Sequence, residues 1–294
     1  MTRMTPFSNP LLLGFDSMEK TLERIAKSGD GYPPYNIERI RAEGVAIHED
    51  AKVVEAVNKS RSSVTIRFET EEGAGEVTGT HVLVAAGRKP NVERLDLEKA
   101  GVAVEKAGIR VDKALRTTNR KIFAIGDVAG GPQFTHVAGY HAGLVVQTIL
   151  FRLAGKVKPG IIPWATYTDP ELAHVGLTEE DARRKRRRIN VLRWPYAEND
   201  RAQTERKTTG HVKLVTDRKG RILGATIAGA GAGEMINLFA LALANGMKAA
   251  DLRGYISPYP TMTEMAKRAA TSYYVPATRN PWVRRVIRFL RVFG

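Results

Sequence analysis

The sequence predicts two structural parts, an α/β portion followed by an α+β layer. Two apolar runs, Thr80–Ala86 and Ile122–Ile125, each stop at a glycine, which is typical of short buried or half-buried strands. Further along, the runs His211–Thr216 and Arg221–Ile227 flank the turn Asp217–Gly220, which predicts a β-hairpin. The first pair of runs indicates the α/β portion, and the hairpin indicates an antiparallel sheet.

The elements around the hairpin complete the α+β prediction. Val191–Trp194 precedes it as another strand, and a helix is expected from Glu234 to Asn245, with Gly246 just past its end. The apolar stripe of this helix would cover one side of the sheet. At 294 residues the chain is long enough for about two domains.

A glycine and an aspartate stand where the run Ile122–Ile125 ends. Gly126 has no Cβ, so a flat cofactor could approach its backbone closely. The carboxylate of Asp127 could accept hydrogen bonds from the vicinal hydroxyls of a ribityl chain. Because Gly-Asp at a strand end is more often an ordinary turn, other segments must decide between these interpretations.

Three segments in a fixed order supply that context. Thr80–Ala86 is closed by Gly87-Arg88-Lys89-Pro90-Asn91, Gly126-Asp127 follows, and Phe134-Thr135-His136 then opens a helix. From about Arg39 to about Tyr274 the chain resembles the flavoprotein pyridine nucleotide-disulfide oxidoreductases, in their mercuric reductase and dihydrolipoamide dehydrogenase branch. The resemblance implies FAD as cofactor, with these binding positions: Gly87, Arg88, Gly126, Asp127, Thr135 and His136.

The sequence departs from that family in its redox chemistry. The family has a Gly-x-Gly-x-x-Gly turn for the flavin pyrophosphate, a Cys-x4-Cys pair and a second glycine turn for NAD(P)H, none of which is present, and the cysteine count is 0. Without a thiolate this chain alone cannot reduce disulfides or mercuric ions. We expect weak or absent FAD binding and no retained NAD(P)H site. The glycines of Ala228–Glu234 lack the fingerprint spacing and fall in the part that resembles a dimerisation domain.

The resemblance divides the chain into five segments. The expected fold is a truncated FAD/NAD(P)-binding Rossmann-like portion followed by a complete α+β dimerisation domain. Residues 1 to about 40 resemble the N-terminal arm of a bacterial Hsp20 small heat-shock protein, although a flexible leader with one helix is an equal alternative. The segments are 1–40, a remnant of the NAD(P)-binding domain at 41–87, part of the FAD-binding domain at 88–158, the dimerisation domain at 159–275 and a basic amphipathic tail at 276–294.

Local elements can be predicted around residue 40 and within the segment 41–87. We expect a helix over Asn36–Gly44 and a strand over Val45–His48. A meander should follow, with strands at Lys52–Val57, Val64–Phe68 and Val82–Ala86 and a turn at Glu72–Gly75.

Tyr259-Pro260-Thr261-Met262-Thr263-Glu264 occupies the acid/base segment of the family. The resemblance implies that Tyr259 stands where glutathione reductase has a histidine, as in mercuric reductases, and that Glu264 is its orienting acid. A phenol with a pKa near 10 is a poor base at neutral pH. We therefore interpret Tyr259 and Glu264 as vestigial catalytic positions and expect a helix start with Pro260 in its first turn.

The chain is strongly basic, with a formal net charge of +15. The densest run, Arg183–Arg188, follows the helix start Thr178–Asp181, so we interpret it as a solvated helix end, not as a nucleic-acid site. The tail Pro281–Gly294 predicts an amphipathic helix that docks on its own dimer or, through Trp282 to Phe293, touches a membrane peripherally. No metal site, membrane span or secretory segment is indicated, so a cytoplasmic location is expected.

The sequence thus predicts a truncated, chimeric member of the FAD-dependent disulfide and mercuric oxidoreductase family, without autonomous reductase activity and homodimeric. The alternative is a non-enzymatic dimerising or chaperone-like interaction protein. Flavin absorbance of the purified chain separates the two.

Overall fold

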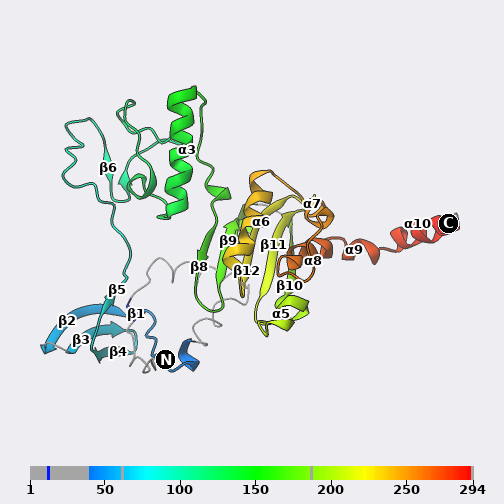
Figure 1. Cartoon of the computed structure of the whole chain (residues 1–294), viewed down its shortest axis with the longest axis horizontal. Coiled ribbons are helices and arrows are strands. Elements are labelled where there is room, and N and C mark those ends of the chain that lie inside the picture. Colours follow the sequence, from blue (N-terminus) through cyan, green and yellow to red (C-terminus); the bar gives the residue numbers. More distant parts are fainter. Residues whose placement is uncertain (1–11, 14–39, 61–62, 186–187, 293–294) are drawn as a thin grey trace. The chain divides into compact units, whose positions relative to one another are not determined.

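The computed structural model describes residues 12–13, 40–60, 63–185 and 188–292. The described residues divide between Lys158 and Pro159 into two compact units (Figure 1). The predicted Hsp20-like arm lies outside the described residues, except for β1 (Leu12–Leu13), which pairs in parallel with β5 (Leu83–Val84). Residues 40–42 are helical, and the chain turns at Gly44. The predicted strand over Val45–His48 is wrong, because these residues pair with no other strand.

A three-stranded antiparallel sheet stands in the first unit. It is built from β2 (Lys52–Ser60), β3 (Ser63–Thr70) and β4 (Gly73–Gly79) in the order β2-β3-β4. β3 confirms the strand predicted at Val64–Phe68, and its Ile66 and Phe68 are buried.

The third strand of this sheet differs from the prediction. The glycines predicted to form a turn belong to β4, and Val82–Ala86 is outside the sheet. A Cβ on Gly75 would come within 2.7 Å of the Phe68 ring, so this glycine makes room for a core aromatic side chain in the facing strand. Gly75 therefore permits close packing within a strand and does not form a turn.

The rest of the first unit holds β6 (Val104–Glu105), β7 (Gly108–Ile109), the 3-10 helix η1 (Gly126–Ala129) and α3 (Thr135–Phe151). A small core of Val102, Ile109 and Ala124 holds the loops together. The helix predicted to open at Phe134 is confirmed by α3.

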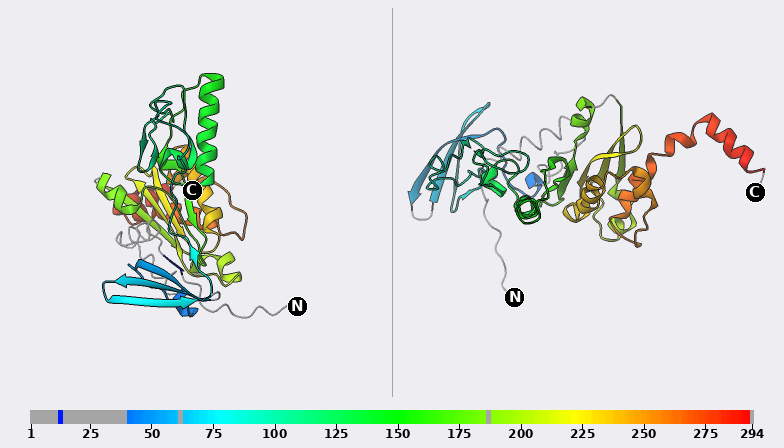
Figure 2. Two further views of the ribbon diagram at one scale, coloured as in Figure 1. Left: turned by 90° about the vertical axis from the view of Figure 1, so that its left-hand side faces the viewer. Right: turned by 90° about the horizontal axis from the view of Figure 1, so that it is seen from above.

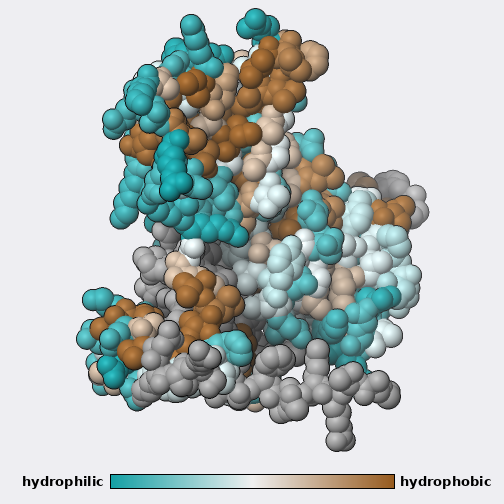
Figure 3. All heavy atoms as spheres, turned by 60° about the vertical axis from the view of Figure 1, so that its left-hand side comes forward, coloured by the Kyte–Doolittle hydropathy of each residue, from teal (hydrophilic) through white to brown (hydrophobic). Residues whose placement is uncertain are grey.

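The structure corrects the buried strand predicted over Thr80–Ala86 and the strand character of the half-buried run Ile122–Ile125. Thr80–Ala86 forms only β5, in which Leu83 and Val84 are 69% and 76% exposed, and Ile122–Ile125 forms only a bridge from Phe123 to Arg116. An α/β sheet buries such strands between neighbours on both faces, and the described residues supply no such neighbours here. Apolar side chains also remain exposed at the C-terminal end of α3 (Figure 3), namely Val146, Ile149, Leu150 and Phe151.

The second unit is built on a five-stranded antiparallel sheet in the order β10-β11-β12-β9-β8 (Figures 1 and 2). Its strands are β8 (Trp164–Thr166), β9 (Leu172–Gly176), β10 (Ile189–Pro195), β11 (His211–Asp217) and β12 (Ile222–Ala228). The hairpin β11–β12 is confirmed, with a turn in which the Gly220 amide bonds to the carbonyl of Asp217 at 3.0 Å.

Two helices cover one face of this sheet. α6 (Ala232–Ala244) packs on β9 and β12, and α8 (Glu264–Ser272) packs on β10 and β11. The resulting core includes Phe239 of α6 and Met265 of α8, both fully buried. The predicted α+β layer is thus confirmed, with a closed core on its helical side.

The remaining elements are short. They are the 3-10 helices η2 (Pro159–Ile161) and η3 (Tyr196–Glu198) and the helices α4 (Glu179–Lys185), α5 (Asp200–Thr204), α7 (Ala249–Gly254), α9 (Val275–Thr278) and α10 (Pro281–Leu290). In α4 the Thr178 hydroxyl accepts the Asp181 amide at 3.1 Å, and Arg183 bonds back to Glu179. No helix in the described ranges is long and apolar enough to cross a membrane.

Candidate functional site

The corner between η1 and α3 collects several of the predicted cofactor positions. Gly126 has a φ of 68° and lies against α3, where a Cβ would be 3.0 Å from that of Ala138. Its amide donates to Nδ1 of the buried His141 at 3.2 Å. Burial lowers the pKa of His141, which favours the neutral imidazole that this bond requires. His141 is therefore a packing residue of the corner.

Asp127 follows at the half-exposed surface of this corner. Within the described part of the chain, no hydrogen bond reaches its carboxylate, although its backbone carbonyl accepts from the Gly130 amide at 3.2 Å. The carboxylate is thus available to accept hydrogen bonds from a ligand hydroxyl.

Arg88 joins the same corner from the preceding loop. Its guanidinium donates to the carbonyl of Gln133 at 3.1 Å, beside the start of α3. Thr135 is exposed in the first turn of α3, and the exposed His136 ring stacks on Phe134 at 5.1 Å. Gly87 has a φ of 102° and open space around it. The predicted binding positions thus gather around η1 and the start of α3.

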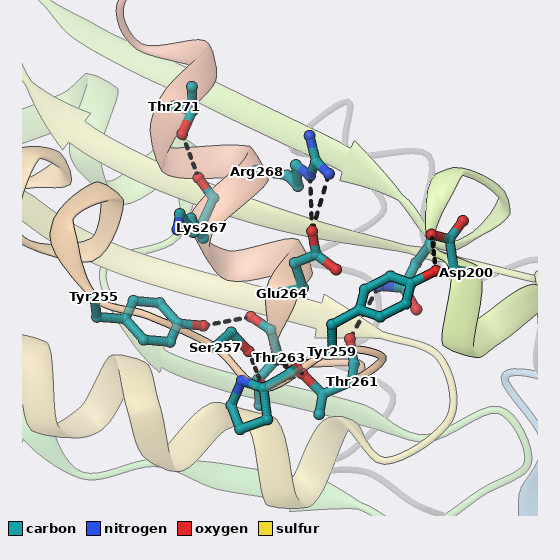
Figure 4. Close-up of polar contacts among 12 residues, drawn as sticks. Asp200, Tyr255, Ser257, Tyr259, Thr261, Thr263, Glu264, Lys267, Arg268 and Thr271 are labelled. Atoms are coloured by element: carbon teal, nitrogen blue, oxygen red, sulfur yellow. Dashed lines mark hydrogen bonds and ion pairs between the residues drawn. The ribbon is translucent and has the colours of Figure 1, made fainter.

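Tyr259 makes a hydrogen bond to a residue that the sequence did not indicate. Its hydroxyl donates to Oδ2 of Asp200 in α5 at 2.9 Å (Figure 4). This hydrogen bond raises the pKa of Tyr259, because the carboxylate stabilises the phenol and repels the phenolate. The side chain is 72% exposed, and its elevated pKa leaves still less phenolate to act as a base at neutral pH.

Glu264 bonds to Arg268 in the described residues. Its Oε1 accepts from the guanidinium of Arg268 at 2.9 Å, one turn along α8 (Figure 4). The expected start of the helix at Pro260 is also wrong, since α8 begins at Glu264 and Pro260 follows a cis peptide bond. Hydroxyls fill the intervening turn, where Ser257 and Thr261 lie 2.8 Å apart.

A buried charge cluster on the face of the five-stranded sheet opposite α6 and α8 was also missed. Lys213 of β11 is 1% exposed, and its Nζ lies 3.8 Å from Oε2 of Glu179. Burial lowers the pKa of Lys213 to about 8. Glu179 also pairs with Arg193, which is opposite Lys213 in the register. The only sequence signal was a lysine at an inward position of a strand, because the partners are distant in sequence.

The glycine-rich turn before α6 is already occupied by protein groups. The Gly233 amide donates to Oε2 of Glu171 at 2.8 Å, and a Cβ on Gly229 would be 2.4 Å from the Tyr196 ring. These glycines serve close packing, in agreement with the rejection of a dinucleotide turn. Among the described residues, no cluster of His, Cys, Asp or Glu could hold a metal ion.

Two family models match the chain and between them reach most of it. Residues 32–142 match the pyridine nucleotide-disulphide oxidoreductase model, and residues 162–270 match the dimerisation domain of the same family. The chain belongs to the pyridine nucleotide-disulphide oxidoreductase family. Residues 162–270 of its second unit match the family's dimerisation domain. The Hsp20-like arm stays a prediction, since the matched ranges begin at residue 32.

Characterised members of the oxidoreductase family are similar along most of this chain. The mercuric reductase of Bacillus cereus is 34% identical over 255 residues, which are 79% of this chain and 40% of that protein. The mitochondrial dihydrolipoyl dehydrogenase of Dictyostelium discoideum is 36% identical over 258 residues, which are 85% of this chain and 52% of that protein. The chain spans about half the length of the curated relatives it matches.

Solved structures of oxidoreductases share the fold. The HOCl-induced flavoprotein disulfide reductase RclA of Escherichia coli has a TM-score of 0.69 and 32% identity, and the match covers 81% of this chain and 54% of that one. LpdA of Mycobacterium tuberculosis has a TM-score of 0.74 at 23% identity and covers 80% of this chain and 51% of its own. The second similarity concerns the fold alone.

Proposed function

We propose that this chain supplies the dimerisation module and part of the flavin-facing surface of a flavin-dependent oxidoreductase, and that by itself it reduces neither disulfides nor mercuric ions. The observation that carries the proposal is a closed dimerisation domain in a sequence with 0 cysteines. Disulfide exchange and mercury binding both need a thiolate, and no side chain of this chain can provide one. The division at Lys158 supports the proposed boundary between segments 88–158 and 159–275.

The second part of the proposal is a homodimer. The dimerisation domain leaves large side chains exposed, among them Ile256 at 88% and Tyr259 at 72%. A second copy packed there would remove this apolar surface from water. The match of residues 162–270 to a dimerisation domain favours a homodimer.

The third part concerns the cofactor. Asp127 fits a ribityl chain because its carboxylate is half-exposed and open to donors, whereas Gly126 is buried and its missing Cβ makes room for Ala138 of α3. A bound flavin would supply the redox chemistry, while Asp127 would orient the ribityl hydroxyls. Recognition of the diphosphate normally rests on a helix N-terminus after a glycine turn, so we expect FAD alone to bind weakly.

A titration of the full chain with FAD, followed by assays with NADH or NADPH and a disulfide or Hg²⁺, tests the proposal. We expect a Kd weaker than about 1 μM, which corresponds to about 8 kcal/mol, with no production of thiol from the disulfide and no elemental mercury from Hg²⁺. Residual FAD binding should fall on Asp127→Ala and stay unchanged on Glu98→Ala, an exposed acid elsewhere. Submicromolar binding, or turnover that produces thiol or elemental mercury, would overturn the proposal.

A second candidate function is non-enzymatic. The exposed apolar side chains of β5 and the end of α3 favour an interaction or chaperone-like role, because such surfaces bind other chains. Suppression of the aggregation of a denatured client by a colourless preparation would select this candidate over the flavoprotein.

A further inference from the structure

α10 is a well-specified helix near the end of the chain. The side chain of Asn280 accepts the Trp282 amide at 2.9 Å, and Pro281 takes the first helical position, where its missing N–H costs nothing. Thus an N-cap and a proline start define this helix, and it continues to Leu290.

The two sides of α10 differ in chemistry, and both are open to solvent. At about 100° per residue the arginines fall on one side and the apolar side chains on the other. Trp282 is 71% exposed, Phe289 63% and Leu290 59%, and α10 has no buried residue. Within the described part of a single chain this apolar side is thus largely exposed, and the predicted docking on the dimer stays a prediction.

The cationic side forms a groove with the end of α9. It is lined by Thr278, Pro281, Arg284, Arg285, Ile287, Arg288 and Arg291. Guanidinium groups are suited to bidentate contacts with phosphate oxygens. After Glu264 the sequence contains no acidic residue, so neighbouring residues do not neutralise these charges.

We infer that α10 binds a membrane surface rich in anionic phospholipid, with its apolar side at the acyl boundary and its arginines on the lipid phosphates. Helices of this composition lie in the plane of the interface. Charge disfavours α10 of a second copy as the occupant, because the pairing would bring two sets of the same arginines together. Exposed Trp282, Phe289 and Leu290 disfavour nucleic acid, which would satisfy the arginines and leave this side in water.

Co-sedimentation of the full chain with vesicles tests this inference. We expect binding to vesicles of phosphatidylglycerol mixed with phosphatidylcholine, little binding to phosphatidylcholine alone, and weakening by salt, which screens the arginines. Emission from Trp282 should shift to shorter wavelength with the anionic vesicles, and Trp282→Phe should remove the shift while leaving binding largely intact. Replacing Arg284, Arg288 and Arg291 by Glu should reduce partitioning on the order of 100-fold or more.

Two matched variants separate a local site from general positive charge. Replacing these arginines by Lys should retain most of the binding. Replacing the exposed residues Lys106, Arg120 and Lys207 by Glu changes the net charge equally and should have a much smaller effect. Absence of wild-type binding to the anionic vesicles, equal loss in both Glu variants, or displacement by duplex DNA with no Trp282 shift would overturn the inference.

Discussion

At the scale of the residue, Tyr259 illustrates how a family position takes a different local partner. Its hydroxyl bonds to Asp200 in α5, whereas Glu264, the expected partner, bonds to Arg268. Asp200 and Tyr259 are 59 positions apart, so no local pattern could have predicted the pair. The contact depends on how α5 packs beside the turn before α8.

This contact predicts a measurable titration. In wild-type protein the pKa of Tyr259 should lie above 10.0, because the hydrogen bond to Asp200 stabilises the protonated phenol. Asp200→Asn removes the charge, so the pKa should fall toward the ordinary tyrosine value. Ultraviolet difference titration, with Tyr259→Phe to assign the signal among the 9 tyrosines, measures it. An unchanged Tyr259 signal in Asp200→Asn would refute the assignment.

Lys213 gives a second prediction at this scale. Its pKa is about 8 in the folded state against 10.5 for an ordinary lysine, so between these values the unfolded state holds more protons. Stability should therefore rise with pH from about 8 to 10.5, and protonation of this residue should cost about 3 kcal/mol at pH 7. Lys213→Met should be more stable at pH 7 and should lose most of this rise.

Denaturant midpoints across that pH range measure the effect. Lys219→Met is the matched control, because Lys219 is exposed in the β11–β12 turn. If Lys213→Met and wild type share the same pH slope, Lys213 is charged in the folded protein at pH 9 and the expectation is wrong.

At the scale of the element, Gly75 in β4 predicts a packing effect. An alanine here would press its Cβ to within 2.7 Å of the Phe68 ring, so Gly75→Ala should destabilise the three-stranded sheet by about 1–3 kcal/mol. Gly79→Ala, where the nearest atom is 3.7 Å away, should cost less. Amide exchange in β2, β3 and β4 reports it, and Phe68→Leu should reduce the cost of Gly75→Ala. Additive effects of the two substitutions would rule out this contact as the cause.

Elements with local signals were predictable. The hairpin β11–β12 has a turn bracketed by alternating strands, and α4 has the reciprocal pair Thr178 and Asp181 at its start. Elements that depend on distant neighbours were not predictable. Thr80–Ala86 is apolar enough for a buried strand, yet Leu83 and Val84 are exposed because burial comes from the facing layers and not from the strand itself.

The candidate site follows the same division. Gly126, Asp127 and the start of α3 were located by an ordered set of motifs, and the structure gathers them. His141 as the acceptor of the Gly126 amide was not predicted, since one histidine on an apolar helix carries no signal for its partner. The cluster of Lys213, Glu179 and Arg193 was missed for the same reason.

At the scale of the whole molecule, the exposed apolar residues of the dimerisation domain predict where two copies meet. Ile256→Asp should shift the chain toward monomer, because it buries a charge in the expected interface. Leu95→Asp, an equal change at a 55% exposed site outside that domain, should not. Size-exclusion chromatography with light scattering distinguishes the two, and dimerisation of Ile256→Asp at wild-type strength would place the interface elsewhere.

We expect this family member to dimerise through residues 162–270 although its own sequence supplies no thiol. Analytical ultracentrifugation of the full chain at tens of micromolar, with flavin absorbance recorded alongside protein absorbance, tests it most directly. The account predicts a homodimer that carries far less than one flavin per chain after purification. A monomer across that concentration range, or a dimer with one tightly bound flavin per chain, would contradict it.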